Sequence, residues 1–163
     1  MASAPRFVGS EVKRLEDPRL IQGQAQYVDD VTLPGLLHAV LLRSPHAHAS
    51  ITRLDVAAAR QPGVVAVFTW RDLEGKVGQK SLGFAPPGIK NPERLPLAKA
   101  EVRFVGHPVA VVVATERAPA RDAADMIQAE YEPLPVVTNP EAATKPGAPK
   151  VYRELPDNIA FEH

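Results

Sequence analysis

The chain has 163 residues, and its nineteen basic and nineteen acidic side chains cancel to a formal charge of zero. A balanced charge gives no electrostatic case for binding nucleic acid or an anionic membrane surface. Cysteine is absent, which excludes disulfides, thiolate catalysis and any iron–sulfur or zinc–thiolate site held by this chain. The length is that of one domain, and the 17 prolines predict many short elements joined by loops.

The two ends of the chain have little pattern of their own. Residues 1–10 are predicted to be a flexible N-terminus, and they have no apolar stretch of the kind found in a signal peptide. No apolar run approaches the roughly 18 residues of a membrane-spanning helix, so we expect a cytoplasmic protein. Residues 151–163 form a tail with no clear core, which leaves residues 11–150 as the expected domain.

Turn signals divide the first part of that domain. Asp17-Pro18 interrupts a charged stretch, and Gly23 closes the short segment that follows. Residues 24–28 could form a short strand that ends at Asp29-Asp30. The two aspartates could bind a hard cation, but a capped turn explains them better.

The next stretch predicts strands over residues 36–43, 46–54 and 64–68, from their apolar runs and alternation. Asp55 is a natural N-cap for a short helix at about residues 55–60, which Pro62-Gly63 stops. Thr69 or Asp72 is expected to cap a further turn, over residues 70–73.

Residues 75–99 are rich in glycine, proline and lysine and have no period, which predicts a long loop. Gly75-Lys76, Gly78 and Lys80-Ser81 are similar to a phosphate-binding loop. The match fails because Gln79 replaces the required glycine and no strand-to-helix context surrounds the segment. Trp70 and Phe84 are better explained as packing or interface residues than as a cofactor stack.

The segment RFVGHPVAVVVA, residues 103–114, organises the chain. Its β-branched run predicts a strand covered on both faces, with a bend at Gly106 and Pro108 at the strand's start. A helix is predicted at about residues 116–131, with Pro119 in its first turn. The buried stripe of this helix would be Ala120, Ala124, Ile127 and Tyr131. Residues 131–137 then predict an extended piece at a sheet edge.

Three histidines are the candidate chemical groups. His46 and His48 alternate along a predicted strand, so both imidazoles could reach one metal. No third ligand is indicated nearby, and polar contacts on a strand face are the better explanation. His107 could be a catalytic base, although a turn histidine bonded to the backbone is the more economical interpretation.

These elements predict an α+β domain with a mixed sheet, one main helix and no active site of its own. The motifs RLEDPRLIQGQAQYVDD, PGLLHAVLLRSPHAHASI, FVGHPVAVVVA and DAADMIQAEYEPLPVV resemble, in order, the α/β-hammerhead domain of molybdenum hydroxylase large subunits. That family contains xanthine dehydrogenase, aldehyde oxidase and carbon monoxide dehydrogenase, and the last is the most similar. The resemblance covers residues 8–163.

The resemblance implies an oxidoreductase complex in which this chain has a structural and assembly role. In the family, larger domains that follow the hammerhead hold the molybdenum–molybdopterin cofactor. Other domains or subunits hold [2Fe–2S] clusters and FAD. No family residue for catalysis, cofactor binding or metal binding maps onto this chain, so we expect it to bind none of these groups alone. It would be a split subunit or a fragment, whose tail leads toward molybdopterin-binding domains.

Docking onto those partners would need an apolar surface. The expected contributors lie around the long loop and in the tail: Trp70, Phe84, Ile89, Val151, Tyr152, Ile159 and Phe161. The alternative is a free-standing, non-enzymatic binding module that reuses the hammerhead fold.

Overall fold

The computed structural model describes residues 7, 9–77, 88–90 and 92–161. The chain divides into two compact units, Met1–Leu36 and Leu37–His163, and each is described by itself. Within the described ranges, no helix is long and apolar enough to cross a membrane.

The N-terminal unit has only short local structure. It contains the helix α1 (Asp17–Ile21), with Pro18 in its first turn, and the 3₁₀ turn η1 (Val28–Asp30). The backbone N–H of Tyr27 donates to Asp30 Oδ2 at 2.9 Å, so the capped-turn interpretation is confirmed for Asp30. The strand predicted over residues 24–28 is wrong. A strand needs a pairing partner, whereas the Asp30 carboxylate satisfies the turn locally.

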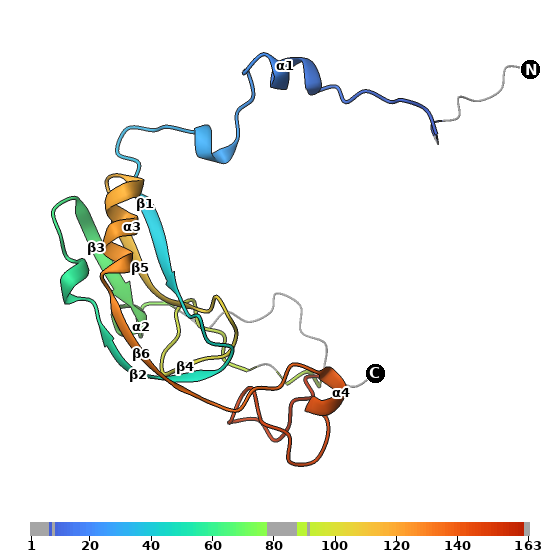
Figure 1. Ribbon diagram of the computed structural model, residues 1–163, viewed down its shortest axis with the longest axis vertical. Helices are drawn as coiled ribbons and strands as arrows, with labels where there is room; N and C mark the ends of the chain where they lie inside the picture. Colours follow the sequence, from blue (N-terminus) through green and yellow to red (C-terminus); the bar gives the residue numbers. More distant parts are fainter. Residues whose placement is uncertain (1–6, 8, 78–87, 91, 162–163) are drawn as a thin grey trace, which may run out of the picture. The chain divides into compact units, whose positions relative to one another are not determined.

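The second unit contains two antiparallel three-stranded sheets (Figure 1). The first has the order β1-β5-β3, with β1 His38–Arg43, β5 Pro108–Ala114 and β3 Val64–Thr69. The second has the order β4-β2-β6, with β4 Glu101–Val102, β2 Ala49–Asp55 and β6 Gln128–Pro133. The α+β class is confirmed. The mixed sheet is wrong, because every strand pair that the structure describes is antiparallel.

Strand β5 is the centre of the first sheet, as its apolar run predicts. Ala110, Val112 and Ala114 are fully buried, whereas Val111 and Val113 are only half-buried. The expectation of two fully covered faces is therefore wrong. One face packs against alanines of the main helix, and the other is partly open.

The main helix, α3, spans Arg117–Asp125 and lies across the first sheet (Figure 1). The predicted buried face is correct for Ala120 and Ala124, and Pro119 falls in the first turn as expected. The predicted end near residue 131 is wrong. Residues 128–133 leave the helix and pair with β2, with Tyr131 opposite Ile51, because strand pairing gives that backbone partners across the second sheet.

Two shorter elements begin close to the predicted capping residues, with Thr69 as the N-cap of one and Val56, in place of the expected Asp55, as the N-cap of the other. Asp55 Oδ1 accepts from the Ala57 N–H at 3.0 Å and opens the single 3₁₀ turn η2 (Ala57–Ala59), which replaces the longer helix expected over residues 55–60. Helix α2 (Trp70–Leu73) begins with a Thr69–Asp72 capping box. The Thr69 backbone N–H and hydroxyl both donate to Asp72 Oδ2, at 2.7 and 2.9 Å, and hold the pKa of Asp72 below its ordinary value.

The remaining described chain is irregular apart from α4 (Pro140–Ala143), which Asn139 caps through a bond from the Ala142 N–H at 3.0 Å. The described parts of the predicted 75–99 loop contain no helix or strand. Leu42 and Leu54 pack against the core clusters of both sheets and join them into one unit.

Candidate functional site

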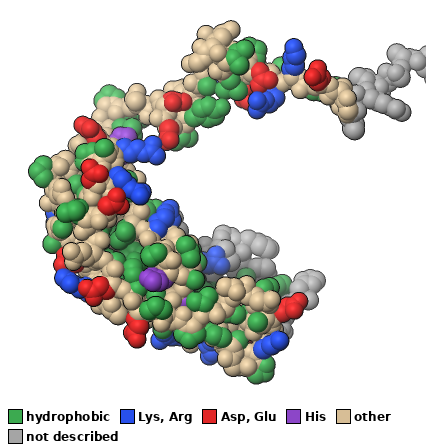
Figure 2. Space-filling model, viewed as in Figure 1, with side chains coloured by type: hydrophobic (Ala, Val, Ile, Leu, Met, Phe, Trp, Pro, Cys, Tyr) green, Lys and Arg blue, Asp and Glu red, His purple; other side chains and the backbone are tan. Residues whose placement is uncertain are grey.

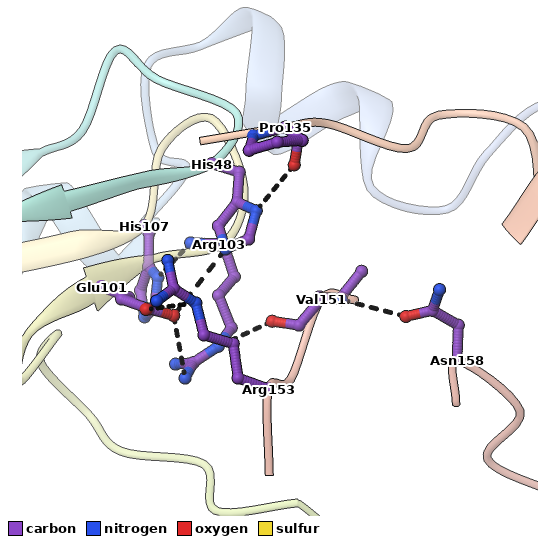
Figure 3. A network of polar contacts seen from close by, with 8 residues as sticks. All are labelled: His48, Glu101, Arg103, His107, Pro135, Val151, Arg153 and Asn158. Carbon is purple, nitrogen blue, oxygen red and sulfur yellow. Dashed lines mark hydrogen bonds and ion pairs between the residues drawn. The ribbon is translucent and has the colours of Figure 1, made fainter. Parts of the chain in front are cut away.

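A network of polar side chains surrounds Glu101, at the start of β4 (Figure 3). The Glu101 side chain is only 15% exposed and faces three cationic or titratable groups. Its Oε1 lies 3.0 Å from Arg153 Nε, and its Oε2 lies 3.6 Å from Arg103 Nη2. His48 Nε2 lies 3.7 Å from the same Oε2. One half-buried carboxylate therefore joins groups from three separate parts of the chain.

His48 precedes β2 and is buried. Its Nδ1 lies 3.0 Å from the carbonyl oxygen of Pro135, and a carbonyl can only accept, so we assign the proton to Nδ1. His48 Nε2 and Glu101 Oε2 then face each other across a gap longer than a hydrogen bond, and neither has another hydrogen-bond partner among the described residues. The imidazole is thus oriented by the Pro135 carbonyl on one side, and its other nitrogen faces a carboxylate without a hydrogen bond to it.

His107 lies in the turn that leads into β5, as its Gly-His-Pro context predicts. Its Nδ1 accepts from the Arg103 backbone N–H at 3.1 Å, and its ring stacks on Phe104 at 4.5 Å. Burial, and then the nearby Arg103 charge, lower the pKa of His107 below its ordinary value. Gly106, with a positive φ of 88°, allows the turn and donates to the Ser44 carbonyl at 2.8 Å.

The C-terminal segment is attached to this network. Arg103 Nε donates to the Val151 carbonyl at 3.0 Å, and its guanidinium lies 4.6 Å above the Tyr152 ring. Asn158 accepts from the Val151 N–H at 2.9 Å and donates to the Ala143 and Pro149 carbonyls at 3.1 and 2.8 Å. The segment that lacked a predicted core is therefore held by side chains that bond its backbone.

A second contact holds the same segment from the long loop. Lys90 Nζ lies 2.6 and 2.8 Å from the two carboxylate oxygens of Asp157. The bond from Lys90, followed by one from the Ile159 N–H, lowers the pKa of Asp157. The Lys90 N–H also donates to the Ala160 carbonyl at 2.9 Å, so the loop and the tail are joined by backbone as well as by charge.

An open cleft of about 590 Å³ lies beside the network. Its walls come from residues 93–100, from residues 101–108 and from Tyr152, Arg153 and Glu154. The charged lining residues are the cationic Arg94, Lys99, Arg103 and Arg153 and the acidic Glu93, Glu101 and Glu154, so most of the charge cancels within the cleft. The arrangement positions backbone segments against one another, and the described residues of the cleft include no nucleophile paired with a base.

The histidine pair does not converge on one point. His46 is half-buried and packs its ring against Tyr131, with ring centres 5.0 Å apart, whereas His48 engages Pro135 and Glu101. In the described ranges, no three His, Asp or Glu side chains come together as metal ligands. The interpretation of both histidines as polar packing residues fits this geometry. His107 Nδ1 is likewise occupied by backbone, as the turn-histidine interpretation predicts.

The phosphate-loop resemblance falls mostly on residues 78–81, which lie outside the described residues, as does Phe84. Lys76 uses its N–H to bond the Leu73 carbonyl at 2.9 Å, which closes α2. The predicted docking surface needs correction. Trp70 is buried, and Ile89, Val151, Tyr152 and Ile159 are half-buried, so of the described members only Phe161 is exposed.

The residues that the sequence did not point to are Glu101, Arg103, Arg153 and Asn158. Their sequence signal is limited to Glu101 and Arg103 at alternate positions just before the predicted central strand, a spacing that places two side chains on one side of an extended chain. Nothing in the pattern links these two with Arg153 or Asn158, about fifty residues later.

Comparison with known proteins decides the family. Residues 22–135 match the family described as aldehyde oxidase and xanthine dehydrogenase, a/b hammerhead domain. The chain belongs to this family. The large chain of carbon monoxide dehydrogenase from Afipia carboxidovorans is 40% identical over 157 residues, which is 96% of this chain and 19% of that one.

Solved structures agree with the family assignment. Quinoline 2-oxidoreductase from Pseudomonas putida 86 is 42% identical, with a TM-score of 0.81, over 94% of this chain and 20% of that one. A Cu,Mo-CO dehydrogenase is 39% identical, with a TM-score of 0.75, over 95% of this chain and 19% of that one. The hammerhead chain thus spans about a fifth of the length of these relatives.

The described residues include no ligand set for an iron–sulfur group. The sequence has no cysteine, and in the described ranges no cluster of three metal-binding side chains occurs. The buried polar atoms around Glu101 are directed at one another and at the tail. We therefore derive no reaction step on this hammerhead chain.

Proposed function

We propose that this chain is the hammerhead part of a molybdenum hydroxylase large subunit, with a structural and assembly role and no turnover of its own. It would act either as a split subunit or as part of a longer polypeptide. The observation that carries the proposal is the alignment of nearly the whole chain, at 40% identity, with a fifth of a carbon monoxide dehydrogenase large chain.

The Glu101 network supports a structural role. Its charged groups are directed at the start of the C-terminal segment: Glu101 pairs with Arg153, and Arg103 donates to the Val151 carbonyl. Asn158 then accepts from the Val151 N–H within that segment. A half-buried carboxylate with arginine partners holds a segment in one position more strictly than apolar contact does, because its bonds are directional. The network therefore gives the C-terminal segment a defined path along β4.

The assembled enzyme would be an oxidoreductase with molybdenum–molybdopterin in the rest of the large subunit. The [2Fe–2S] clusters and FAD would belong to other domains or subunits, and those chains would be the partners. The substrate is left open, since the relatives are named for substrates as different as carbon monoxide and quinoline. Location in the cytoplasm is part of the proposal.

The test is purification of the tagged chain from its native host. We expect it to elute with polypeptide carrying molybdopterin, and with molybdenum near one atom per chain by elemental analysis. The chain purified alone should oxidise no aldehyde, N-heterocycle or carbon monoxide with an artificial electron acceptor. Deletion of residues 151–163 should weaken the complex, because the Glu101 network then loses its partners in the tail.

Two results would contradict the proposal. One is turnover by the purified chain alone. The other is a chain that elutes free of any molybdenum-containing partner, which would favour a free-standing binding module. A control substitution outside the tail is Glu130→Gln, since Glu130 is exposed on β6 and its side chain lies 3.3 Å from the exposed Arg53.

A further inference from the structure

Two acceptor atoms with little access to solvent face each other inside the Glu101 network, among the side chains of Figures 2 and 3. His48 is 8% exposed, and its Nε2 lies 3.7 Å from Oε2 of Glu101, whose side chain is 15% exposed. Neither atom has a hydrogen-bond partner among the described residues. Buried polar atoms are nearly always hydrogen-bonded to protein or to ordered water, so this pair indicates a bound group.

The proton on His48 Nδ1 decides what kind of group can bind between the two atoms. Nδ1 donates to the Pro135 carbonyl at 3.0 Å, which leaves Nε2 with a lone pair directed at Glu101. A carboxylate oxygen is also an acceptor. Two acceptors cannot bond each other, so a group that satisfies both must donate two hydrogens. A water molecule can do this through its two O–H bonds.

The charges around Glu101 disfavour a metal ion at this position. Arg103 Nη2 lies 3.6 Å from the same Glu101 oxygen, and Arg153 Nε lies 3.0 Å from the other one. These two guanidinium groups would repel a cation, and the described part of the chain contains no group of three His, Asp or Glu side chains that could hold one. A water molecule is neutral, and its oxygen can also accept a hydrogen bond from Arg103.

The structure has room for such a molecule beside these groups. A cavity of about 30 Å³ borders His48 and Arg103, and Pro135 and Val151 also contribute to its wall. One buried water needs roughly 10–15 Å³ and typically makes about three hydrogen bonds. The cavity is therefore large enough, and the side chains of His48, Glu101 and Arg103 can supply the three partners.

We propose that one water molecule binds between His48 Nε2 and Glu101 Oε2, donates to both atoms and accepts from the Arg103 guanidinium. The water would join the residue before β2 to the edge strand β4. Through the bond from Arg103 to the Val151 carbonyl, it would also support the position of the C-terminal segment. This inference concerns the folded chain by itself and does not depend on the proposed function.

The first measurement is NMR on the complete chain with ¹⁵N-labelled histidine at neutral pH. Correlations between the ring nitrogens and ring protons report which nitrogen carries the proton. We expect His48 to carry it on Nδ1, and we expect a nuclear Overhauser effect from long-lived water to the ring protons beside Nε2. His46, whose ring packs against Tyr131, is the control without that effect. A proton on Nε2 of His48 would overturn the proposal, because Nε2 would then donate to Glu101 directly.

The second measurement is a crystal structure of the same chain, at a resolution that shows ordered water. We expect one oxygen peak within about 3.2 Å of both His48 Nε2 and Glu101 Oε2. A direct contact of hydrogen-bond length between these two atoms, with no peak between them, would overturn the proposal. A peak that contacts only one of them would also overturn it. A peak at about 2.1 Å from Nε2 would show a metal ion in place of water, with the same consequence.

His48→Gln tests whether the two facing acceptors select the water. The new side-chain amide can donate to Glu101 itself, so we expect the oxygen peak between the two side chains to disappear. His46→Gln changes the histidine that packs against Tyr131 and should retain the peak. Peaks of equal strength in the two variants would overturn the proposal, because the cavity alone would then hold the water. If His48→Gln does not fold, the two measurements on the unchanged chain decide the proposal.

Discussion

The two sheets of the second unit are stabilised in different ways. Under α3, the sheet β1-β5-β3 encloses a cluster of alanine, valine and isoleucine, including Ala110, Val112 and Ala124. The sheet β4-β2-β6 has a smaller apolar cluster, and Glu101 with its arginine partners lies at its β4 edge. The first region is held by close packing, and the second by directional bonds to a distant segment.

This difference indicates that the first sheet contributes more to the free energy of folding, whereas the second determines where the C-terminal segment lies. Small side chains let a helix approach a sheet closely. A larger or charged side chain at such a contact therefore forces the helix and the sheet apart and destabilises the fold. A half-exposed ion network gives less free energy because water competes for each charge, but it determines which backbone lies where. We expect substitutions in the first region to unfold the domain and those in the second to release the tail.

The largest effect is expected for Ala124→Arg. Ala124 is 3% exposed in the cluster under α3, so an arginine there both overpacks the core and buries an unpaired charge. The cost in unfolding free energy should be on the order of 3–5 kcal/mol, measured by urea unfolding.

Asp125→Arg is the control on the exposed side of the same helix. It loses only the exposed Arg121–Asp125 pair at 3.5 Å and should change the unfolding free energy by no more than about 0.5 kcal/mol. Equal melting temperatures for the two variants would contradict the assigned helix face.

Glu101→Gln should have an intermediate effect. The amide keeps the size of the side chain but loses the charge that Arg153, Arg103 and His48 face. We expect a loss of about 2 kcal/mol, reduced from that of a fully buried pair because Arg153 is exposed. Hydrogen exchange should show release of residues 151–158 before β5.

Glu130→Gln is the matched change on an exposed glutamate and should cost less than about 0.5 kcal/mol. A tail that stays protected in Glu101→Gln would show that packing, and not this network, holds the segment.

Asn158→Ala tests whether the tail can be released without unfolding the core under α3. The substitution removes three bonds to backbone, from Val151 and to Ala143 and Pro149. The expected loss of about 1–2 kcal/mol should appear as faster exchange and faster proteolysis around residues 144–161, with little change in the core under α3. Uniform loss of protection across β5 would contradict a local role.

The smallest effect is a pH dependence at His107. Its folded pKa lies below its ordinary value, so the unfolded chain binds more protons as the pH falls below about 6.5. The contribution of His107 to the free energy of unfolding is therefore fully present above that pH and is lost as the pH falls. The reason is that a protonated Nδ1 cannot accept a hydrogen bond from the Arg103 N–H. His107→Leu should be less stable at neutral pH but should lose less between about pH 7 and pH 5. Parallel pH profiles for the two proteins would contradict this assignment.

Much of the fold could be predicted from the sequence, because it depends on contacts between near neighbours in the chain and on the periodic spacing of apolar residues. The β-branched run from Val109 to Ala114 predicts the central strand, and the spacing of Ala120 and Ala124 predicts which side of α3 is buried. Thr69 with Asp72 and Asp55 with Ala57 predict the starts of two short elements. Each of these contacts joins residues only a few positions apart.

Tertiary structure decided the features that depend on distant partners. The helical spacing continues past Asp125, but pairing with β2 draws residues 128–133 into a strand. Residues 24–28 have the composition of a strand, but in their own unit the structure describes no strand for them to pair with. Arg153 meets Glu101 across fifty residues of chain, and no local pattern encodes such a meeting. Helix caps and periodic spacing involve residues that are close in sequence. Strand pairing and buried charge networks form only when folding brings distant segments of the chain together.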